Sequence, residues 1–142
     1  LQSVILTKED EIVLTPAYYV FKMYRVHQYA TLIPTDLKCE NYEFNGQSIP
    51  AVNASASTKD GVVSGTFCNL NPNKKESIDL TLAGQEFKSA SGQIITSKNM
   101  NDCNDFGKDE IVKINSFEVK KPKNGKLSID LPAKSVVLIQ LK

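Results

Sequence analysis

The order of apolar and polar residues near the start of the chain has the period of a helix. Apolar side chains recur at positions i, i+3, i+4 and i+7 and form one stripe (Ala17, Val20, Phe21 and Tyr24). Thr15 can cap the helix and Pro16 suits its first position, so we predict a helix over residues 15–28. Further apolar residues widen the stripe, so this helix needs a large surface to pack on. We expect its packing residues to be Val20, Phe21, Met23 and Tyr24.

Beyond Ala30 the pattern changes to that of short strands. Residues 77–82 and 126–131 alternate between apolar and polar with a period of two, and residues 62–68 are rich in strand-forming residues. Residues 135–141 form a nearly continuous apolar run, which is typical of a strand covered on both faces. The chain therefore has a helical start and a β-rich remainder.

Pairs of turn-forming residues punctuate these strands. They occur at Asn45–Gly46, Asp60–Gly61, Asn71–Pro72, Ser91–Gly92 and Asn124–Gly125. Asp60–Gly61 and Asn124–Gly125 lie between predicted strands, so each predicts a two-residue β-hairpin. Many short strands joined by such turns are typical of an antiparallel sandwich. We therefore predict a mainly β fold, a jelly-roll-like antiparallel β-sandwich preceded by one α-helix.

Composition and charge narrow the class of protein. The chain has 142 residues, of which 41% are hydrophobic and 23% charged, with a net charge of +1, and this fits one globular domain. Lys and Arg are scattered, whereas nucleic-acid binding needs a clustered basic surface. No apolar run approaches the roughly 20 residues of a membrane span. We expect neither nucleic acid nor membrane as a partner. Because the chain does not begin with Met, we expect it to be a piece of a longer polypeptide.

Candidate catalytic and metal-binding groups are few. His27 is the only histidine, and near a helix end a histidine usually interacts with the last carbonyl groups. The three carboxylates of residues 9–11 are expected in a solvated connecting loop. Residues 102–113 look like a calcium-binding loop, but Phe106 and Lys113 occupy ligand positions. We expect a polar loop there, with an irregular cation site as the alternative, and no catalytic, cofactor or metal residue in the chain.

Cysteines and aromatic residues bear on two further kinds of site. Cys39, Cys68 and Cys103 lack Cys-x-x-Cys spacing, so we expect three buried or partly buried thiols, with one disulfide as the alternative. A carbohydrate-binding module usually presents a row of exposed aromatic rings. The chain has no Trp, and three of its five Tyr lie in the helix region, so only Tyr29, at the junction, and Tyr42 remain. A sugar-binding groove would be expected near Tyr42 and Phe44.

The helical segment carries a resemblance to a known family. Residues 14–28, Leu-Thr-Pro-Ala-Tyr-Tyr-Val-Phe-Lys-Met-Tyr-Arg-Val-His-Gln, resemble the last barrel helix of family 51 glycoside hydrolases, the α-L-arabinofuranosidases. Three more segments are similar to that family: residues 1–7, residues 67–72 with their Asn-Leu-Asn-Pro turn, and residues 131–137 with their Leu-Pro-x-x-Ser-Val strand. Ala17 and Tyr19 depart from the family, which usually has Thr and His there.

The resemblance implies two parts. Residues 1–29 would be the tail end of a (β/α)8 catalytic barrel, and residues 30–142 the C-terminal β-sandwich. The family removes terminal α-L-arabinofuranosyl groups from arabinan or arabinoxylan with retention, which requires two carboxyl groups about 5–5.5 Å apart. Both glutamates lie on barrel strands, which would precede Leu1, so this chain alone should not be an enzyme. A segment from the N-terminus of the family's proteins contributes to the sandwich, so one sheet edge would be open here.

Three functions follow as hypotheses. The first is a non-catalytic accessory domain that supports the catalytic barrel of the same polypeptide and takes part in homo-oligomers. Arabinose-containing polysaccharide would then be bound by the parent enzyme as a whole. The second is a carbohydrate-binding sandwich that targets the parent to its polysaccharide. The third is an independent enzyme with an unrecognised site. The first accounts for the broad apolar helix, and it predicts an exposed apolar patch and self-association of the isolated chain.

Overall fold

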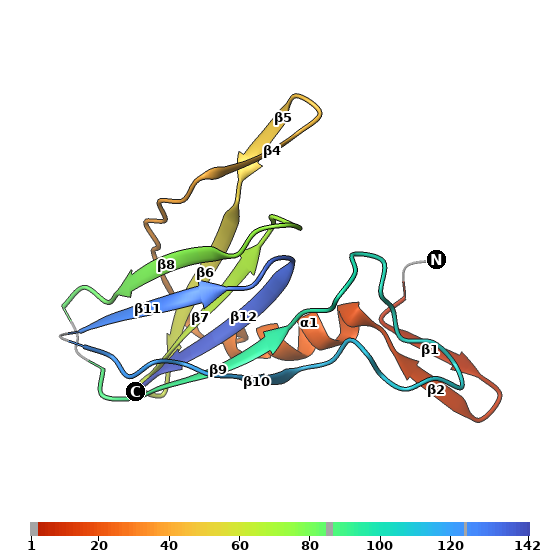
Figure 1. Ribbon diagram of the computed structural model, residues 1–142. Coiled ribbons are helices and arrows are strands. Elements are labelled where there is room, and N and C mark those ends of the chain that lie inside the picture. The colour runs from red at the N-terminus through yellow and green to blue at the C-terminus, as the bar shows by residue number, and fades with distance from the viewer. Residues whose placement is uncertain (1–2, 85–86, 124) are drawn as a thin grey trace.

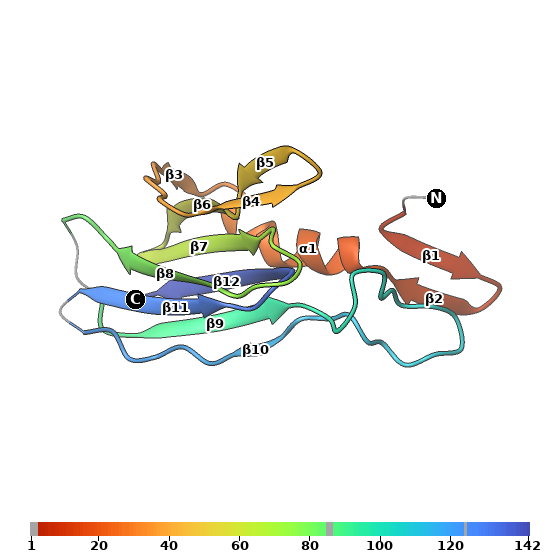
Figure 2. The same cartoon turned by 45° about the horizontal axis from the view of Figure 1, so that its top comes forward.

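The strands form two unequal layers in the computed structural model, which describes residues 3–84, 87–123 and 125–142. The larger layer is a six-stranded sheet in the order β10-β9-β12-β7-β6-β3, and β8 pairs with β11 as a second layer (Figures 1 and 2). All of these pairings are antiparallel. The strands span β3 Thr31–Ile33, β6 Val52–Lys59, β7 Val62–Asn69, β8 Glu76–Thr81, β9 Ala90–Ile95, β10 Asn115–Phe117, β11 Lys126–Leu131 and β12 Ser135–Leu141. The predicted mainly β, antiparallel fold is confirmed.

The hydrophobic core lies between the two layers. Every second residue of β11 is buried against the large sheet, as its alternating sequence predicts (Leu127, Ile129 and Leu131). From the opposite side, β12 contributes Val137 and Ile139, both completely buried. Strand β12 is buried along most of its length, because α1 covers its other face. This explains the continuous apolar run at residues 135–141.

The hairpin turns follow the chemistry of their residues. Asp60 and Gly61 both adopt a positive φ, 51° and 76°, and join β6 to β7 in the predicted two-residue hairpin. Asn124 of the other predicted hairpin lies outside the described residues. The predicted turn at Ser91–Gly92 is wrong, because Gly92 lies inside β9. A Cβ on Gly92 would approach the carbonyl oxygen of Phe117 to 2.8 Å, so this glycine permits close contact with β10.

The first elements are a hairpin and a short helix. Strands β1 (Ile5–Lys8) and β2 (Glu11–Leu14) form an antiparallel hairpin, and the loop expected at residues 9–11 is reduced to its turn, where Glu9 has a φ of 54°. The runs of strand-forming residues on either side of the acidic turn are only four residues long, and we did not predict them as strands. The helix α1 spans Pro16–Tyr24 and continues as a tighter 3-10 turn, η1 (Arg25–His27), so the helical segment ends one residue before the predicted end at about residue 28.

A second hairpin projects from the sandwich. Strands β4 (Asn41–Phe44) and β5 (Gln47–Pro50) extend away from the two layers in Figure 1, and most of their residues are exposed. At the other side of the molecule, the loop between β9 and β10 runs beside the β1–β2 hairpin (Figures 1 and 2). Within the described part of the chain, no helix is long and apolar enough to cross a membrane.

Candidate domain interface

The inward face of α1 packs on the large sheet of the domain itself. Tyr19 and Met23, one turn apart, are buried against Ile95 of β9 and Leu138 of β12. Val112, from the loop between β9 and β10, closes the same cluster. This second cluster lies on the face of the sheet opposite to the main core. The helix is therefore part of the domain, whatever else it contacts.

The four predicted packing residues of the helix separate into two groups. Met23 is only 1% exposed, and Val20 and Tyr24 are half-buried at the edge of the same cluster. Phe21 is 66% exposed and points away from it. Strands β9 and β12 therefore already cover Met23 and part of Val20 and Tyr24, and Phe21 is the member of the four that the domain leaves uncovered. Packing of this helix against a barrel stays a prediction, and it now concerns Phe21 above all.

His27 anchors the end of the helical segment to the sheet. Its Nδ1 lies 2.7 Å from the Ser57 hydroxyl and its Nε2 lies 3.1 Å from the Thr66 hydroxyl. Its ring therefore contacts hydroxyl groups of β6 and β7 instead of the last helix carbonyls that we expected. Burial lowers the pKa of His27 from its usual value, so the neutral ring predominates at neutral pH. These partners could not be predicted from the sequence pattern, because Ser57 and Thr66 are 30 and 39 residues away from His27.

A second polar contact lies beside His27. The Tyr24 hydroxyl is 3.4 Å from Cys68 Sγ, and the Tyr24 ring packs edge-on to the imidazole of His27. Burial, and then the contact with Cys68, raises the pKa of Tyr24. These groups lie on the helix side of the sheet, where they hold the end of α1 in one position.

Beyond α1 the same side of the sheet carries another exposed apolar residue. Leu32 on the edge strand β3 stands opposite Ser57, the residue that contacts His27. Leu32 is exposed, as is Phe21. We call these two residues and the sheet surface between them the helix-side surface. Its two large apolar side chains are available for contact with another body.

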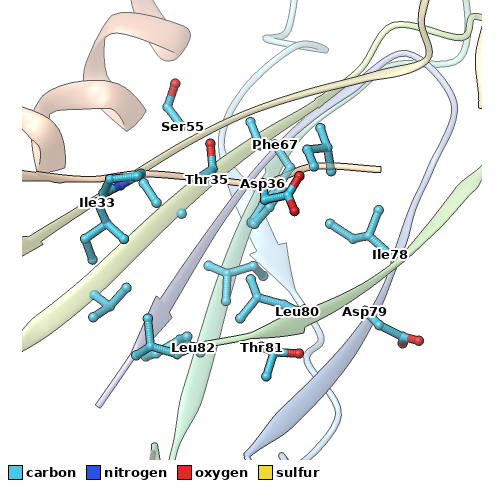
Figure 3. Close-up of a pocket in the computed structure, with 18 residues that line it drawn as sticks. Ile33, Thr35, Asp36, Ser55, Phe67, Ile78, Asp79, Leu80, Thr81 and Leu82 are labelled. Carbon is cyan, nitrogen blue, oxygen red and sulfur yellow. The ribbon is translucent and has the colours of Figure 1, made fainter. Parts of the chain in front are cut away.

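An apolar groove opens on the other side of the sheet. One wall is β8 with Leu80 and the adjoining Leu82, the opposite wall is the segment from Ile33 to Leu37, and Phe67 lies on the floor (Figure 3). Its volume is about 160 Å³. Strand β8 pairs with β11 on one side only, and no described strand pairs with its other edge. The groove thus lies beside an unpaired strand edge.

The candidate sugar-binding residues lie elsewhere. Tyr42 and Phe44 share one face of β4 on the projecting hairpin, where Tyr42 stands opposite Ile49 of β5. Phe44 is 63% exposed, while Tyr42 is half-buried. Neither residue lines the groove beside β8. The two rings therefore do not combine with that groove into an aromatic-lined cleft.

The remaining candidate residues take structural roles or lie exposed. Glu9 and Asp10 form the turn of the β1–β2 hairpin, and Glu11 is the first residue of β2. In the loop between β9 and β10, the described residues include no group of His, Cys, Asp or Glu side chains placed to hold a metal ion. All three cysteines are free thiols. Cys103 is exposed, so our expectation of a buried or partly buried thiol is wrong for that residue.

Comparison with known proteins connects this architecture to a family. Residues 1–135 match the family described as "Alpha-L-arabinofuranosidase C-terminal domain". The chain belongs to this family. An intracellular exo-α-L-arabinofuranosidase from Bacteroides ovatus is 44% identical to this arabinofuranosidase domain, and the match covers the whole domain. The suspected resemblance to the α-L-arabinofuranosidases is confirmed, and a solved structure of 31% identity assigns it to family 51.

Solved structures agree with the sequence comparison. The family 51 arabinofuranosidase from Xanthomonas axonopodis pv. citri superposes on all of this arabinofuranosidase domain with a TM-score of 0.95 and 31% identity. A family 51 α-L-arabinofuranosidase from Bifidobacterium longum shares the fold, with a TM-score of 0.86 at 16% identity over 99% of the domain. The domain spans only 28% of the Bacteroides protein, 29% of the Xanthomonas chain and 28% of the Bifidobacterium chain.

Proposed function

We propose that this chain is the non-catalytic accessory domain of an α-L-arabinofuranosidase, and that it packs against and stabilises the catalytic barrel of the same polypeptide. The parent enzyme would release terminal α-L-arabinofuranosyl groups from arabinan or arabinoxylan with retention, using two barrel carboxyl groups about 5–5.5 Å apart. The domain would contribute no group to the bond-breaking step. Its contribution would be the position and stability of the barrel's last helix, α1.

The observation that carries this proposal is the division of α1 into a covered and an uncovered side. Tyr19 and Met23 already fill the contact with the sheet, so Phe21 is not needed for the domain's own core. A large exposed aromatic residue on a helix otherwise packed on its sheet is a favourable anchor for another protein surface. Leu32 on the same side extends that contact across the helix-side surface.

The relatives supply a suitable partner for this surface. Because the domain spans 28% of the Bacteroides arabinofuranosidase, most of that protein lies outside the matched region. A (β/α)8 barrel needs about 250 residues, and its outer ring consists of helices. A helix that packs on the sandwich with one side and on neighbouring barrel helices with the other would join the two bodies.

The groove beside β8 suggests a second contact with the same polypeptide. A further strand could pair with the free edge of β8 and cover the apolar floor around Phe67. We propose that a segment from the N-terminal part of the parent lies there. Amide hydrogen exchange in β8 should then be slower in the intact enzyme than in the 142-residue chain. Equal exchange in the two proteins would contradict this contact.

The helix-side contact is tested by replacing two equally exposed aromatic residues. Phe21→Ser should lower the unfolding free energy of the intact enzyme by about 1–3 kcal/mol, because the ring would lose its buried position against the barrel. The same change in the 142-residue chain should alter stability by less than about 0.5 kcal/mol. Phe44→Ser is the matched control, since Phe44 is 63% exposed and Phe21 66%, and it should be neutral in both proteins. Urea denaturation measures all four values.

The other hypotheses give different outcomes. If Phe21→Ser is neutral in the intact enzyme, α1 does not face the barrel and the proposal fails. If Phe44→Ser instead weakens binding of arabinan oligosaccharides in a calorimetric titration, the domain is a carbohydrate-binding module. Sedimentation of the 142-residue chain with and without Phe21→Ser shows whether a second copy can occupy the same surface. Loss of self-association in the variant would support homo-oligomer contacts through Phe21.

A further inference from the structure

The loop between β9 and β10, residues 96–114, holds the start of α1 through one buried side chain. Asn104 is 5% exposed, and its amide nitrogen donates to the carbonyl oxygens of Leu14 and Val112, both at 2.8 Å. Its side-chain oxygen accepts from the backbone N–H groups of Ile111 and Val112, at 3.0 and 2.9 Å. An asparagine amide offers two donors and two acceptor positions, and here all four are used.

Thr15 holds the same segment from its other side. Thr15 occupies the N-cap position, but its side chain makes no cap hydrogen bond, contrary to our expectation. Its hydroxyl instead lies 2.9 Å from the carbonyl oxygen of Ser3 and 2.8 Å from that of Val4. Its backbone N–H also donates to Val4, at 3.2 Å. Residues 3–15 therefore form a closed unit whose end is tied to the loop by Asn104.

A third contact joins this loop to the helix. The Tyr19 hydroxyl donates to Oε1 of Glu110 at 2.7 Å. Burial, and then this hydrogen bond, raises the pKa of Tyr19 to about 12, so the phenol remains a donor at neutral pH. The loop of residues 96–114 thus contacts both the helix and the segment before it.

We propose that Asn104 and Thr15 are positioning residues for the reaction of the intact enzyme, because they fix the segment of residues 3–15 that leads into α1. This inference rests on the proposed function, in which α1 is the last helix of the barrel. In a (β/α)8 barrel the segment between a strand and its following helix lies on the face that carries the active site. A displacement of about 1 Å in such a site can reduce the rate by about 100-fold. The sandwich would thereby influence turnover without contacting substrate.

The test compares two buried asparagines of the intact enzyme. Asn69 is 3% exposed and donates to Lys74, Leu131 and Pro132, far from residues 3–15. Replacement by Asp gives either site a carboxylate oxygen facing carbonyl oxygens, so both variants should lose stability. Under conditions where both are folded, Asn104→Asp should lower kcat on an aryl α-L-arabinofuranoside about 10-fold or more, with KM changed by less than about threefold. Asn69→Asp should keep kcat within about twofold of the unmodified enzyme.

A milder pair of substitutions decides the matter if Asn104→Asp does not fold. Thr15→Val removes the hydroxyl and keeps the shape, and it should lower kcat about threefold or more. Thr15→Ser keeps the hydroxyl and should restore kcat. Equal kcat values for the two asparagine variants, or for Thr15→Val and the unmodified enzyme, would overturn the inference. Failure of the proposed function looks different, since the unmodified enzyme would then lack arabinofuranosidase activity or Phe21→Ser would be neutral in it.

Discussion

The two faces of the six-stranded sheet are both largely covered, but by different chemistry. The face toward β8 and β11 is covered through aliphatic and aromatic side chains (Val63, Phe67, Val137, Ile139 and Leu141). The face toward α1 and η1 buries hydroxyl groups beside its apolar residues (Ser57, Ser64 and Thr66). The first face gains stability from the apolar area that it removes from water, and this gain does not depend on the geometry of individual contacts. The second face must provide each buried hydroxyl with a partner.

The partners on the helix side are specific. The ring of His27 forms hydrogen bonds with the hydroxyl groups of Ser57 and Thr66, and the Gln140 side chain donates to the hydroxyl of Ser64 at 3.3 Å. Among the described residues, every buried side-chain nitrogen or oxygen has a hydrogen-bond partner. The polar face therefore allows few positions for η1, whereas apolar packing tolerates adjustment. A face of this kind suits a helix that has to be held accurately for a second body.

The largest expected effect lies on the apolar face. Ile139→Ala should reduce the unfolding free energy of the chain by about 2–5 kcal/mol, because it leaves a cavity at the centre of the core. Ile139→Val should cost about 0.5–1.5 kcal/mol. Urea denaturation measures both. A loss below 1 kcal/mol for the alanine variant would show that this face is not the main source of stability.

An intermediate effect is expected on the polar face. Thr66→Val keeps the shape of a completely buried residue but removes the hydroxyl that meets Nε2 of His27. The unpaired nitrogen should cost about 1–3 kcal/mol of unfolding free energy. Thr66→Ser keeps the hydroxyl and serves as the control. If Thr66→Val were as stable as the unmodified chain, specific pairing would not distinguish the two faces.

The smallest effect is a pH dependence of stability that originates on the polar face. Burial lowers the pKa of His27 below 6.5, so the unfolded chain binds its proton first as the pH falls. Stability from this group is therefore complete above about pH 6.5 and declines as the pH is lowered toward the folded pKa. Denaturation midpoints between pH 7.5 and 5.5 should decrease for the unmodified chain and less for His27→Gln. Identical slopes would exclude His27 as the source.

The strand pattern could be predicted because its signals are local. Alternation over residues 126–131 and the continuous run over residues 135–141 correspond to β11 and β12, since a strand's period reflects which face is buried. Asp60–Gly61 tolerates the positive φ angles that a tight hairpin requires. Residues 5–8 and 11–14 also form strands, which we did not predict, and of the loop expected at residues 9–11 only Glu9 and Asp10 form a turn.

The helix shows where local reasoning was insufficient. The helix was correctly predicted, but its inward face was not, because Tyr19 and Met23 are buried whereas Ala17 and Phe21 of the predicted stripe are exposed. Met23 packs with Tyr19 against Ile95 of β9 and Leu138 of β12, whereas Phe21 lies outside this cluster. Asn104 was likewise taken for part of a polar loop, since its main partner outside that loop, Leu14, is 90 residues away.

The sequence by itself determined the antiparallel β class, the position of the helix and the family, because periodicity, turn chemistry and local motifs act over a few residues. Only the tertiary structure decided that His27 pairs with Ser57 and Thr66, that Asn104 holds the start of α1, and that Phe21 stays uncovered. These contacts join residues about 30 to 90 positions apart, or depend on how much of the helix a neighbouring sheet can cover. Hydrogen bonds and burial of that kind depend on the packing of whole elements, which no short stretch of sequence encodes.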